Sequence, residues 1–322
     1  MSRTDIAIVV IGRNEGPRLD RCLASRGGLP TVYVDSGSVD GSPGRARAAG
    51  VEVIELDPDA GHSAARGRNA GLDRLLADPA IAYIQMLDGD SILAADWTDR
   101  GAAALHADPG LGAVFGRLRE EEPDASLYAW LSDVEWAVPP GPAALFSGNV
   151  MLRADAVRST GRYRADMIAG EDPEFAIRMR AAGWHFRCLD HPMAIHQGDI
   201  RDMRQWWRRT CRAGYAFAAL NALHPGSPLH GFGRSRTRIL FWGGVVPIVG
   251  LGGLILAAAA DTRWIALAGA ALLLVAAHIV RLTLRETHRY GLWRASALAL
   301  SFTIGKYAEM AGLIRFHLGR RP

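Results

Sequence analysis

Short apolar, β-branched runs alternate with helical segments in the first ninety residues, and this alternation constrains the fold more than any other feature. The predicted strands are residues 6–11, 31–34, 51–54 and 81–87. The predicted helices between them are residues 17–24, 41–49 and 62–76. A repeated strand–helix–strand order builds an α/β fold in which a mostly parallel, Rossmann-like sheet carries helices on both faces.

The next segment is less regular. Short strands are predicted at residues 113–116 and 144–146, and helices at residues 174–182 and 203–220. Residues 221–237 are rich in Pro, Gly and Ser and are predicted to be a linker. The chain is therefore divided into a first domain over residues 1–220, this linker, and a C-terminal region over residues 238–322.

Polar side chains follow three of the predicted strands. Asn14 and Glu15 follow the first, Asp35 ends the second, and Asp88 and Asp90 follow the fourth. Ligands of parallel sheets bind at the carboxyl ends of the strands, so these groups are expected at one edge. Two carboxylates one residue apart can bind a hard divalent cation, which in turn can hold the phosphates of an activated substrate.

Charge is distributed unevenly along the chain. The net charge is +4, but residues 1–237 carry 27 basic and 30 acidic residues, and the remainder carries ten and three. The first domain therefore lacks a basic stripe, which argues against nucleic-acid binding. Three widely spaced cysteines indicate a reducing compartment. The N-terminus lacks the features of a signal peptide, so the first domain is expected in the cytoplasm.

The C-terminal region is apolar enough to enter a membrane. Residues 239–260 and 264–280 carry no charge, and a tight connector would join them as a transmembrane hairpin. Arginines flank both ends, which places the flanks on the cytoplasmic side of the inner, or plasma, membrane. Residues 291–318 are interrupted by charges and form either a third span or, as we favour, an amphipathic interfacial helix. The alternative is the core of a soluble helical domain.

Six short motifs follow one another in a specific order and spacing. They are residues 9–15 (VVIGRNE), 34–41 (VDSGSVDG), 65–71 (ARGRNAG), 88–90 (DGD), 147–149 (SGN) and 170–172 (GED). On these motifs the chain resembles family 2 glycosyltransferases, which are inverting enzymes of the GT-A fold, from about residue 6 to residue 219. The resemblance implies transfer of a sugar from a nucleotide-sugar donor.

The resemblance also implies the donor-binding residues, which are Asn14, Glu15, Asp35, Arg68, Asp88 and Gly148. The family often has a second Asp after Asp35, where this chain has Ser36. Taken alone, residues 35–38 are better interpreted as an ordinary Asx turn. Gly148 would allow the backbone to approach the donor or acceptor sugar closely.

The implied metal is Mg²⁺ or Mn²⁺, bound by Asp90 and Asp88 to the donor diphosphate, with His196 as a further ligand. The alternative for His196 is an ordinary polar loop residue. The implied catalytic residues are Asp172, as the base that deprotonates the acceptor hydroxyl, and its neighbour Glu171. Asp172 followed by Pro173 is also a good N-cap followed by Pro at the first helical position.

Residues 205–209 (QWWRR) resemble the Gln-x-x-Arg-Trp motif of processive polysaccharide synthases, but Arg209 replaces the final Trp. The alternative is an amphipathic helix with Trp and Arg at the headgroup level. The sequence thus predicts a membrane-associated, metal-dependent inverting glycosyltransferase with a lipid-linked or glycan acceptor, such as a growing cell-envelope glycan. The alternatives are a nucleotidyltransferase that makes activated sugars and a non-catalytic nucleotide-binding scaffold.

Overall fold

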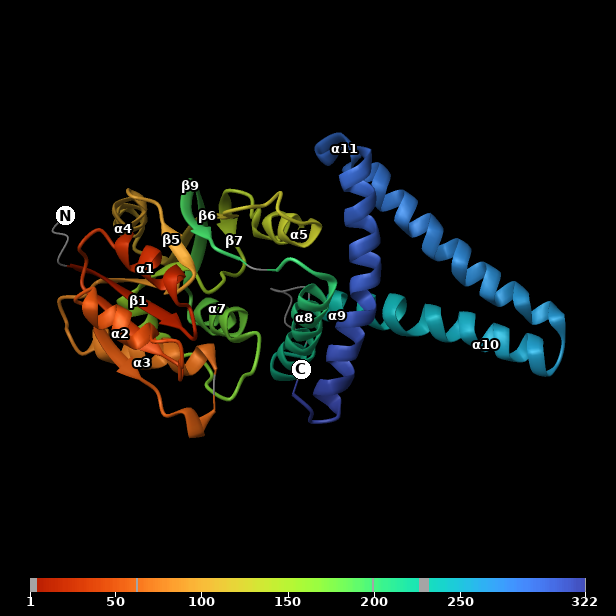
Figure 1. The fold of residues 1–322 in the computed structure, drawn as a ribbon, viewed down its shortest axis with the longest axis horizontal. Coiled ribbons are helices and arrows are strands. Elements are labelled where there is room, and N and C mark those ends of the chain that lie inside the picture. Colours follow the sequence, from red (N-terminus) through yellow and green to blue (C-terminus); the bar gives the residue numbers. More distant parts are fainter. Residues whose placement is uncertain (1–4, 62, 199, 226–231, 322) are drawn as a thin grey trace. The chain divides into compact units, whose positions relative to one another are not determined.

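The computed structural model describes residues 5–61, 63–198, 200–225 and 232–321. By its internal contacts the chain divides into two compact units, Met1–Ile200 and Arg201–Pro322. Figure 1 shows the first unit as a sheet with helices around it and the second as helices alone. Each unit is described by itself.

The described part of the first unit contains one nine-stranded sheet. Its order is β3 (Glu52–Glu55), β2 (Thr31–Asp35), β1 (Ile6–Gly12), β4 (Tyr83–Asp88), β8 (Val150–Arg153), β6 (Leu111–Glu120), β9 (His185–His196) and β5 (Ser91–Leu93), with β7 (Gly141–Ala143) paired to β9. The four strands predicted in the first ninety residues are confirmed, as is a strand around residues 113–116.

The sheet is mixed rather than mostly parallel. Strands β1 to β4 are parallel to one another, as predicted, and β6 is parallel to β9. Strand β8 runs antiparallel to both β4 and β6, and β5 and β7 run antiparallel to β9. The strand predicted at residues 144–146 is wrong, because the chain pairs with β9 over Gly141–Ala143 instead and then leaves the sheet.

Helices cover both faces of this sheet. The helices are α1 (Pro17–Ala24), α2 (Ser42–Ala48), α3 (Ala64–Leu76), α4 (Trp97–Ala107), α5 (Leu127–Trp136), α6 (Ala154–Thr160) and α7 (Glu171–Ala181). On α3, a Cβ at Gly71 would lie 2.3 Å from Val9. On α4, Trp97 donates a hydrogen bond to Gln85, which lies beside Ile8 in the sheet. Since Ile8 and Val9 point to opposite faces, α3 and α4 lie on opposite sides.

Two helix starts differ from the sequence prediction. The predicted start of α3, His62, lies outside the described residues, and the helix begins at Ala64 with Ser63 as its N-cap. Helix α7 begins at Glu171, three residues early, and its N-cap is Gly170 with φ 88°. Asp172 is therefore not an N-cap but lies in the first turn, because the left-handed glycine already ends the preceding loop.

The second unit is helical throughout its described residues. Its elements are α8 (Met203–Leu223), α9 (Phe232–Leu240), a π-helical turn η3 (Phe241–Val245), α10 (Val246–Ala259), a 3₁₀ turn η4 (Thr262–Trp264) and α11 (Ile265–His317). The predicted second span and the predicted helix at 291–318 are both parts of α11, because residues 281–290 are helical too. A change of backbone direction occurs at Gly291, where φ is 74°.

Helix α8 packs closely on the last part of α11. A Cβ at Gly214 would lie 2.0 Å from the carbonyl oxygen of Glu309, and one at Gly312 would lie 1.9 Å from that of Cys211. Glycines thus let the two backbones approach, as small residues do between membrane helices. By contacts α8 belongs to the second unit, whereas the sequence prediction placed it in the first domain.

The QWWRR segment lies at the start of α8 and contributes to its packing on α11. Gln205 completes a capping box with Asp202 at the start of α8. Trp206 is buried, and its ring lies 3.6 Å from the Cβ position of Gly305 on α11. Trp206 therefore packs between helices and is not placed on an outer surface of this unit.

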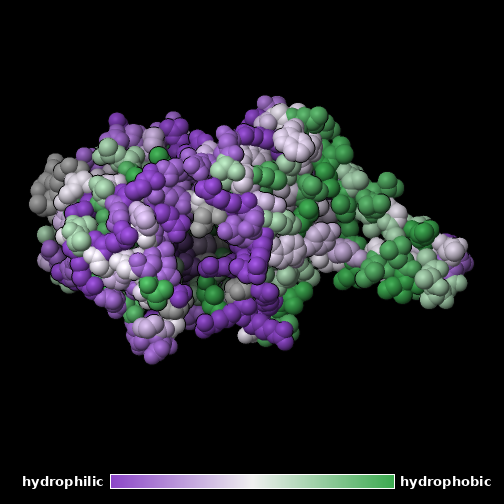
Figure 2. All heavy atoms as spheres, viewed as in Figure 1, coloured by the Kyte–Doolittle hydropathy of each residue, from purple (hydrophilic) through white to green (hydrophobic). Residues whose placement is uncertain are grey.

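Apolar side chains cover the outside of α10 and of the first part of α11 (Figure 2). Leu272 and Leu273 are 70% and 72% exposed, and Ile248 is 69% exposed. Residues 233–259 and 262–317 form two helices long and apolar enough to cross a membrane, each with a mean hydropathy of 2.2 over its most apolar window. This criterion rests on length and composition alone.

Candidate active site

A buried arginine joins three carboxylates at the edge of the sheet. Arg68 comes from α3 and is 4% exposed. Its Nη2 lies 3.1 Å from Asp88 Oδ1, at the end of β4. Its Nη1 lies 2.8 Å from Glu171 Oε1 and 3.4 Å from Asp172 Oδ1, in the first turn of α7. The guanidinium thus connects the Asp88 side of the site to the α7 side.

Gly148 makes room for this arginine. A Cβ there would lie 2.2 Å from Arg68 Nη2 and 3.1 Å from Asp88 Oδ2. The neighbouring Asn149 accepts a hydrogen bond from the backbone N–H of Asp88 at 2.9 Å and donates one to Ser91 at 3.2 Å. Gly148 therefore leaves the space for the Arg68–Asp88 contact, and Asn149 binds the backbone of Asp88 next to it.

Burial raises the pKa of two carboxyl groups beside Arg68, those of Asp172 and Asp88. The pKa of Asp172 rises to about 8, because burial and the neighbouring Glu171 and Asp88 outweigh the lowering effect of Arg68. The pKa of Asp88 is also raised, chiefly by burial. Asp172 Oδ1 accepts no hydrogen bond from the described residues. A carboxyl group of this kind is suited to accept a proton near neutral pH.

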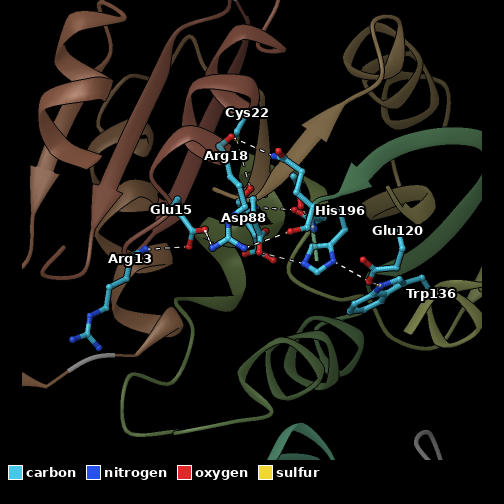
Figure 3. A network of polar contacts seen from close by, with 12 residues as sticks. Arg13, Glu15, Arg18, Cys22, Asp88, Glu120, Trp136 and His196 are labelled. Atoms are coloured by element: carbon cyan, nitrogen blue, oxygen red, sulfur yellow. Dashed lines mark hydrogen bonds and ion pairs between the residues drawn. The ribbon is translucent and has the colours of Figure 1, made fainter. Parts of the chain in front are cut away.

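A second polar chain leads from Asp90 into the protein. His196, at the end of β9, places Nε2 3.3 Å from Asp90 Oδ2 and Nδ1 3.0 Å from Glu120 Oε1. Trp136 on α5 donates to the same Glu120 oxygen at 2.7 Å. Figure 3 shows His196 between Asp88 on one side and Glu120 and Trp136 on the other. Burial lowers the pKa of His196, but its contacts with Asp90 and Glu120 outweigh this and raise it to about 10.

Comparison with known proteins finds a family model that matches the part of the chain carrying Arg68, Asp88 and Asp90. Residues 7–152 match the model of glycosyl transferase family 2. Over this part of its length the chain is similar to glycosyl transferase family 2. The matched residues contain Arg68, Asp88, Asp90 and Gly148, whereas Glu171, Asp172 and His196 lie beyond them.

Two proteins illustrate the similarity. The chain is 27% identical over 239 residues to the pre-mycofactocin glycosyltransferase of Mycobacterium tuberculosis, an alignment that covers 70% of this chain and 49% of the relative. The chain thus spans about half the length of the curated relatives it matches. The solved mannosyltransferase PcManGT from Pyrobaculum calidifontis has a TM-score of 0.58 and 18% identity, covering 100% of this chain and 89% of that one. This likeness shows a GT-A-like fold.

The carboxylates of Asp88 and Asp90 have the chemistry that a hard divalent cation requires. Asp90 Oδ1 is buried and has no hydrogen-bond partner among the described residues, so it has capacity for a ligand. Within the described part of the chain, no three His, Cys, Asp or Glu side chains are already arranged to hold a metal ion. A cation at Asp88 and Asp90 would take further ligands from the donor phosphates, which is usual for Mg²⁺.

The remaining predicted donor residues lie in two neighbouring loops. Asp35 is buried and accepts hydrogen bonds from the backbone of Gly37 and Ser38 and from two hydroxyl groups. Asn14, with φ 59°, accepts from the backbone N–H of Val39 at 2.8 Å. Both side chains therefore shape the 35–39 loop, and for Asp35 the Asx-turn interpretation describes its contacts.

Glu15 lies nearer to the aspartate pair. It is an ion-pair partner of Arg18, at 3.1 Å. Burial and the charge of Asp90 raise its pKa to about 7. In Figure 3 its side chain extends from the end of β1 toward Asp88. Glu15 is therefore the member of the predicted donor set that adds negative charge beside the Asp88–Asp90 pair.

Sequence reasoning did not identify Glu120 and Trp136. Glu120 lies on β6, opposite His196 on β9 in the sheet register. The two residues are 76 positions apart, and neither β9 nor the pairing of β6 with β9 was predicted. The alternating exposed and buried residues at the end of β6 were the only signal, and they do not specify a partner.

Proposed function

We propose that this chain is a metal-dependent inverting glycosyltransferase that moves a sugar from a nucleotide-sugar donor to an acceptor hydroxyl. One observation carries the proposal: Arg68 contacts Asp88 on one side and Asp172 on the other. A carboxylate suited to a cation and its diphosphate thus lies one guanidinium away from a carboxylate suited to a proton. Inverting transfer requires both groups around one reacting carbon.

Asp90 and Asp88 are the residues proposed to hold Mn²⁺ or Mg²⁺. The cation would stabilise the negative charge of the departing nucleoside diphosphate. PcManGT was solved in complex with GDP-Man and Mn²⁺, which supports the choice of a nucleotide-sugar and a divalent cation. The loops proposed to surround the nucleoside contain Asn14, Glu15 and Asp35. Gly148 leaves the space that the Arg68 side chain occupies.

Asp172 is the proposed base. Its carboxylate accepts the proton of the acceptor hydroxyl as that oxygen attacks the sugar. Glu171 holds Arg68 through a 2.8 Å contact. Arg68 can therefore contact Asp88 and Asp172 at the same time. The loss of negative charge at Asp172 in the step is favoured because it is crowded by Glu171 and Asp88.

We also propose that the second unit attaches the enzyme to the cytoplasmic side of the inner, or plasma, membrane. Support comes from the exposed leucines of α11 and from the arginines that follow its apolar part, namely Arg281, Arg285 and Arg289. A chain held at a bilayer suits a lipid-linked or cell-surface glycan acceptor. Residues 291–317 would then lie at or in the membrane as part of α11.

The function can be tested with the purified full chain in detergent. UDP-, GDP- and dTDP-sugars are screened with Mn²⁺ by thermal shift, since a bound donor raises the melting temperature by mass action. The active donor should release its nucleoside diphosphate, and EDTA should abolish the release. Asp172→Asn should bind the donor normally but turn over about 10²–10⁴-fold more slowly. Asp166→Asn, which removes an exposed carboxylate paired with Arg164, is the matched control.

The alternatives give different results in the same assay. Release of pyrophosphate with formation of a nucleotide-sugar would indicate a nucleotidyltransferase. Donor binding without turnover in any condition would indicate a non-catalytic scaffold. Near-normal turnover in Asp172→Asn would remove this residue as the base.

A further inference from the structure

Glu120 is a buried carboxylate that the proposed reaction does not use. Its Oε1 accepts hydrogen bonds from Trp136 and from His196, and its side chain is 5% exposed. Burying a carboxylate is costly unless specific donors compensate it. Two donors compensate the burial of the Glu120 carboxylate: the indole nitrogen of Trp136 at 2.7 Å and the Nδ1 of His196 at 3.0 Å. The other ring nitrogen of His196 faces Asp90.

The backbone is arranged around the Glu120–His196 contact. The two residues are register partners in the parallel β6–β9 pair, so their side chains project from neighbouring strands. Gly198 leaves the space that the pair occupies. A Cβ there would lie 2.3 Å from Glu120 Oε2 and 2.9 Å from His196 Nδ1. Strand register and a glycine thus favour this contact together.

The contact determines which nitrogen of His196 faces the site. A carboxylate accepts a hydrogen bond, so Glu120 keeps a proton on Nδ1 and directs Nε2 toward Asp90, where a bound cation would displace the Nε2 proton. The indole ring of Trp136 packs edge-on against the imidazole, with centroids 5.8 Å apart and an interplanar angle of 69°. One hydrogen bond and one ring contact therefore restrict both the tautomer and the tilt of the imidazole.

We propose that Glu120 is a positioning residue that orients His196 so that its Nε2 serves the cation site at Asp90. The proposal rests on the metal dependence stated under the proposed function. Metal-binding histidines characteristically donate their other ring N–H to a carboxylate, and loss of that partner weakens metal binding about 10–100-fold. Glu120 is such a carboxylate partner for Nδ1 of His196, and Trp136 donates a hydrogen bond to Glu120.

The test measures Mn²⁺ affinity, with no substrate present, by electron paramagnetic resonance of the free ion. Glu120→Ala should weaken Mn²⁺ binding about 10–100-fold. Glu120→Gln should restore most of it, because an amide oxygen can still accept from Trp136 and from Nδ1. Glu121→Ala is the matched control: it removes the adjacent carboxylate, which pairs with Arg21, and should leave the affinity unchanged.

A double variant separates positioning from a structural role. Because Glu120 acts through His196, the Glu120→Ala/His196→Ala variant should bind Mn²⁺ no more weakly than His196→Ala alone. If Glu120→Ala is poorly folded, Trp136→Phe provides a milder test, since it removes the N–H donor to Glu120 but keeps an aromatic ring at this position, and it should weaken binding by a smaller factor. Wild-type Mn²⁺ affinity in the folded Glu120 variants, or additive losses in the double variant, would overturn the inference while leaving the proposed function intact. Failure of the wild-type chain to bind Mn²⁺ without a donor would overturn this inference, because His196 would then not help to form a cation site, whereas the proposed function is decided by the donor screen and the EDTA control.

Discussion

In the first unit the largest apolar side chains lie inside, whereas in the second unit many of them lie outside. Trp97, Tyr33 and Phe175 are fully buried around the sheet. Trp293 on α11 is 82% exposed, and Leu272 and Leu273 are 70% and 72% exposed. The first unit also buries a charged group, because Arg68 lies among carboxylates with 4% of its side chain exposed.

The difference supports the proposed attachment of the second unit to a membrane. Water drives the burial of apolar surface in the first unit, and the buried charge of Arg68 has carboxylate partners there. Exposed leucines along more than one helix would be unfavourable in water, but they are suited to lipid, where helix contacts depend on close backbone packing. The comparison makes three predictions, ordered from the largest expected effect to the smallest.

The first prediction concerns the buried charges of the first unit. Arg68→Met should destabilise that unit by about 3–5 kcal/mol, because it leaves buried carboxylates without their cation. The loss should be larger at pH 9 than at pH 6: the raised pKa of Asp172, about 8, means that its carboxyl group carries most of its charge only at the higher pH. Denaturant unfolding at the two pH values measures both effects.

Arg74→Met is the control, since Arg74 lies on the same helix but pairs with Glu52 at the surface. It should change stability far less than Arg68→Met does, because exposed ion pairs contribute little. Equal effects of the two substitutions would contradict the idea that the Arg68 cluster depends on burial.

The second prediction concerns the apolar exterior of the second unit. Leu273→Arg should cost about 2.5–3.5 kcal/mol of membrane insertion, because the side chain would face hydrocarbon. Flotation of the full chain with lipid vesicles measures this as a shift toward the aqueous fraction. Val39→Arg, at a 92% exposed position of the first unit, should leave flotation unchanged. Unaltered flotation of Leu273→Arg would favour a soluble helical domain.

The third prediction concerns helix packing within the second unit. Gly312→Leu should destabilise this unit by about 1–3 kcal/mol, because its Cβ position lies 1.9 Å from the carbonyl oxygen of Cys211. Gly269→Leu, on the same helix with open space around it, should be tolerated. Thermal unfolding in detergent, followed by tryptophan fluorescence, compares the two. Similar melting temperatures for both variants would mean that α8 and α11 do not depend on this contact.

The sequence predicted the first half of the sheet well, because each strand there is a continuous apolar run and a helix separates it from the next strand. It predicted the second half poorly. Strand β9 mixes exposed and buried residues over His185–His196, and β7 spans only Gly141–Ala143. Such strands are defined by their partners rather than by their composition.

The candidate site divides in the same way. Asp88 and Asp90 were located from sequence because they follow a recognisable strand at the edge where ligands bind. The helix start at Glu171 was misplaced, because a glycine N-cap gives a weaker signal than Asp172 followed by Pro173. The use of Gly148 to make room for Arg68 could not be predicted, since it depends on side chains from α3.

The sequence by itself determined the strand–helix alternation, the polar strand ends and the separation of a charged region from an apolar one, because these are patterns of neighbouring residues. Only the tertiary structure decided which distant groups meet. Arg68 contacts Glu171 across 103 positions, and Glu120 contacts His196 across 76. Strand order and register create these contacts, and no local pattern encodes them.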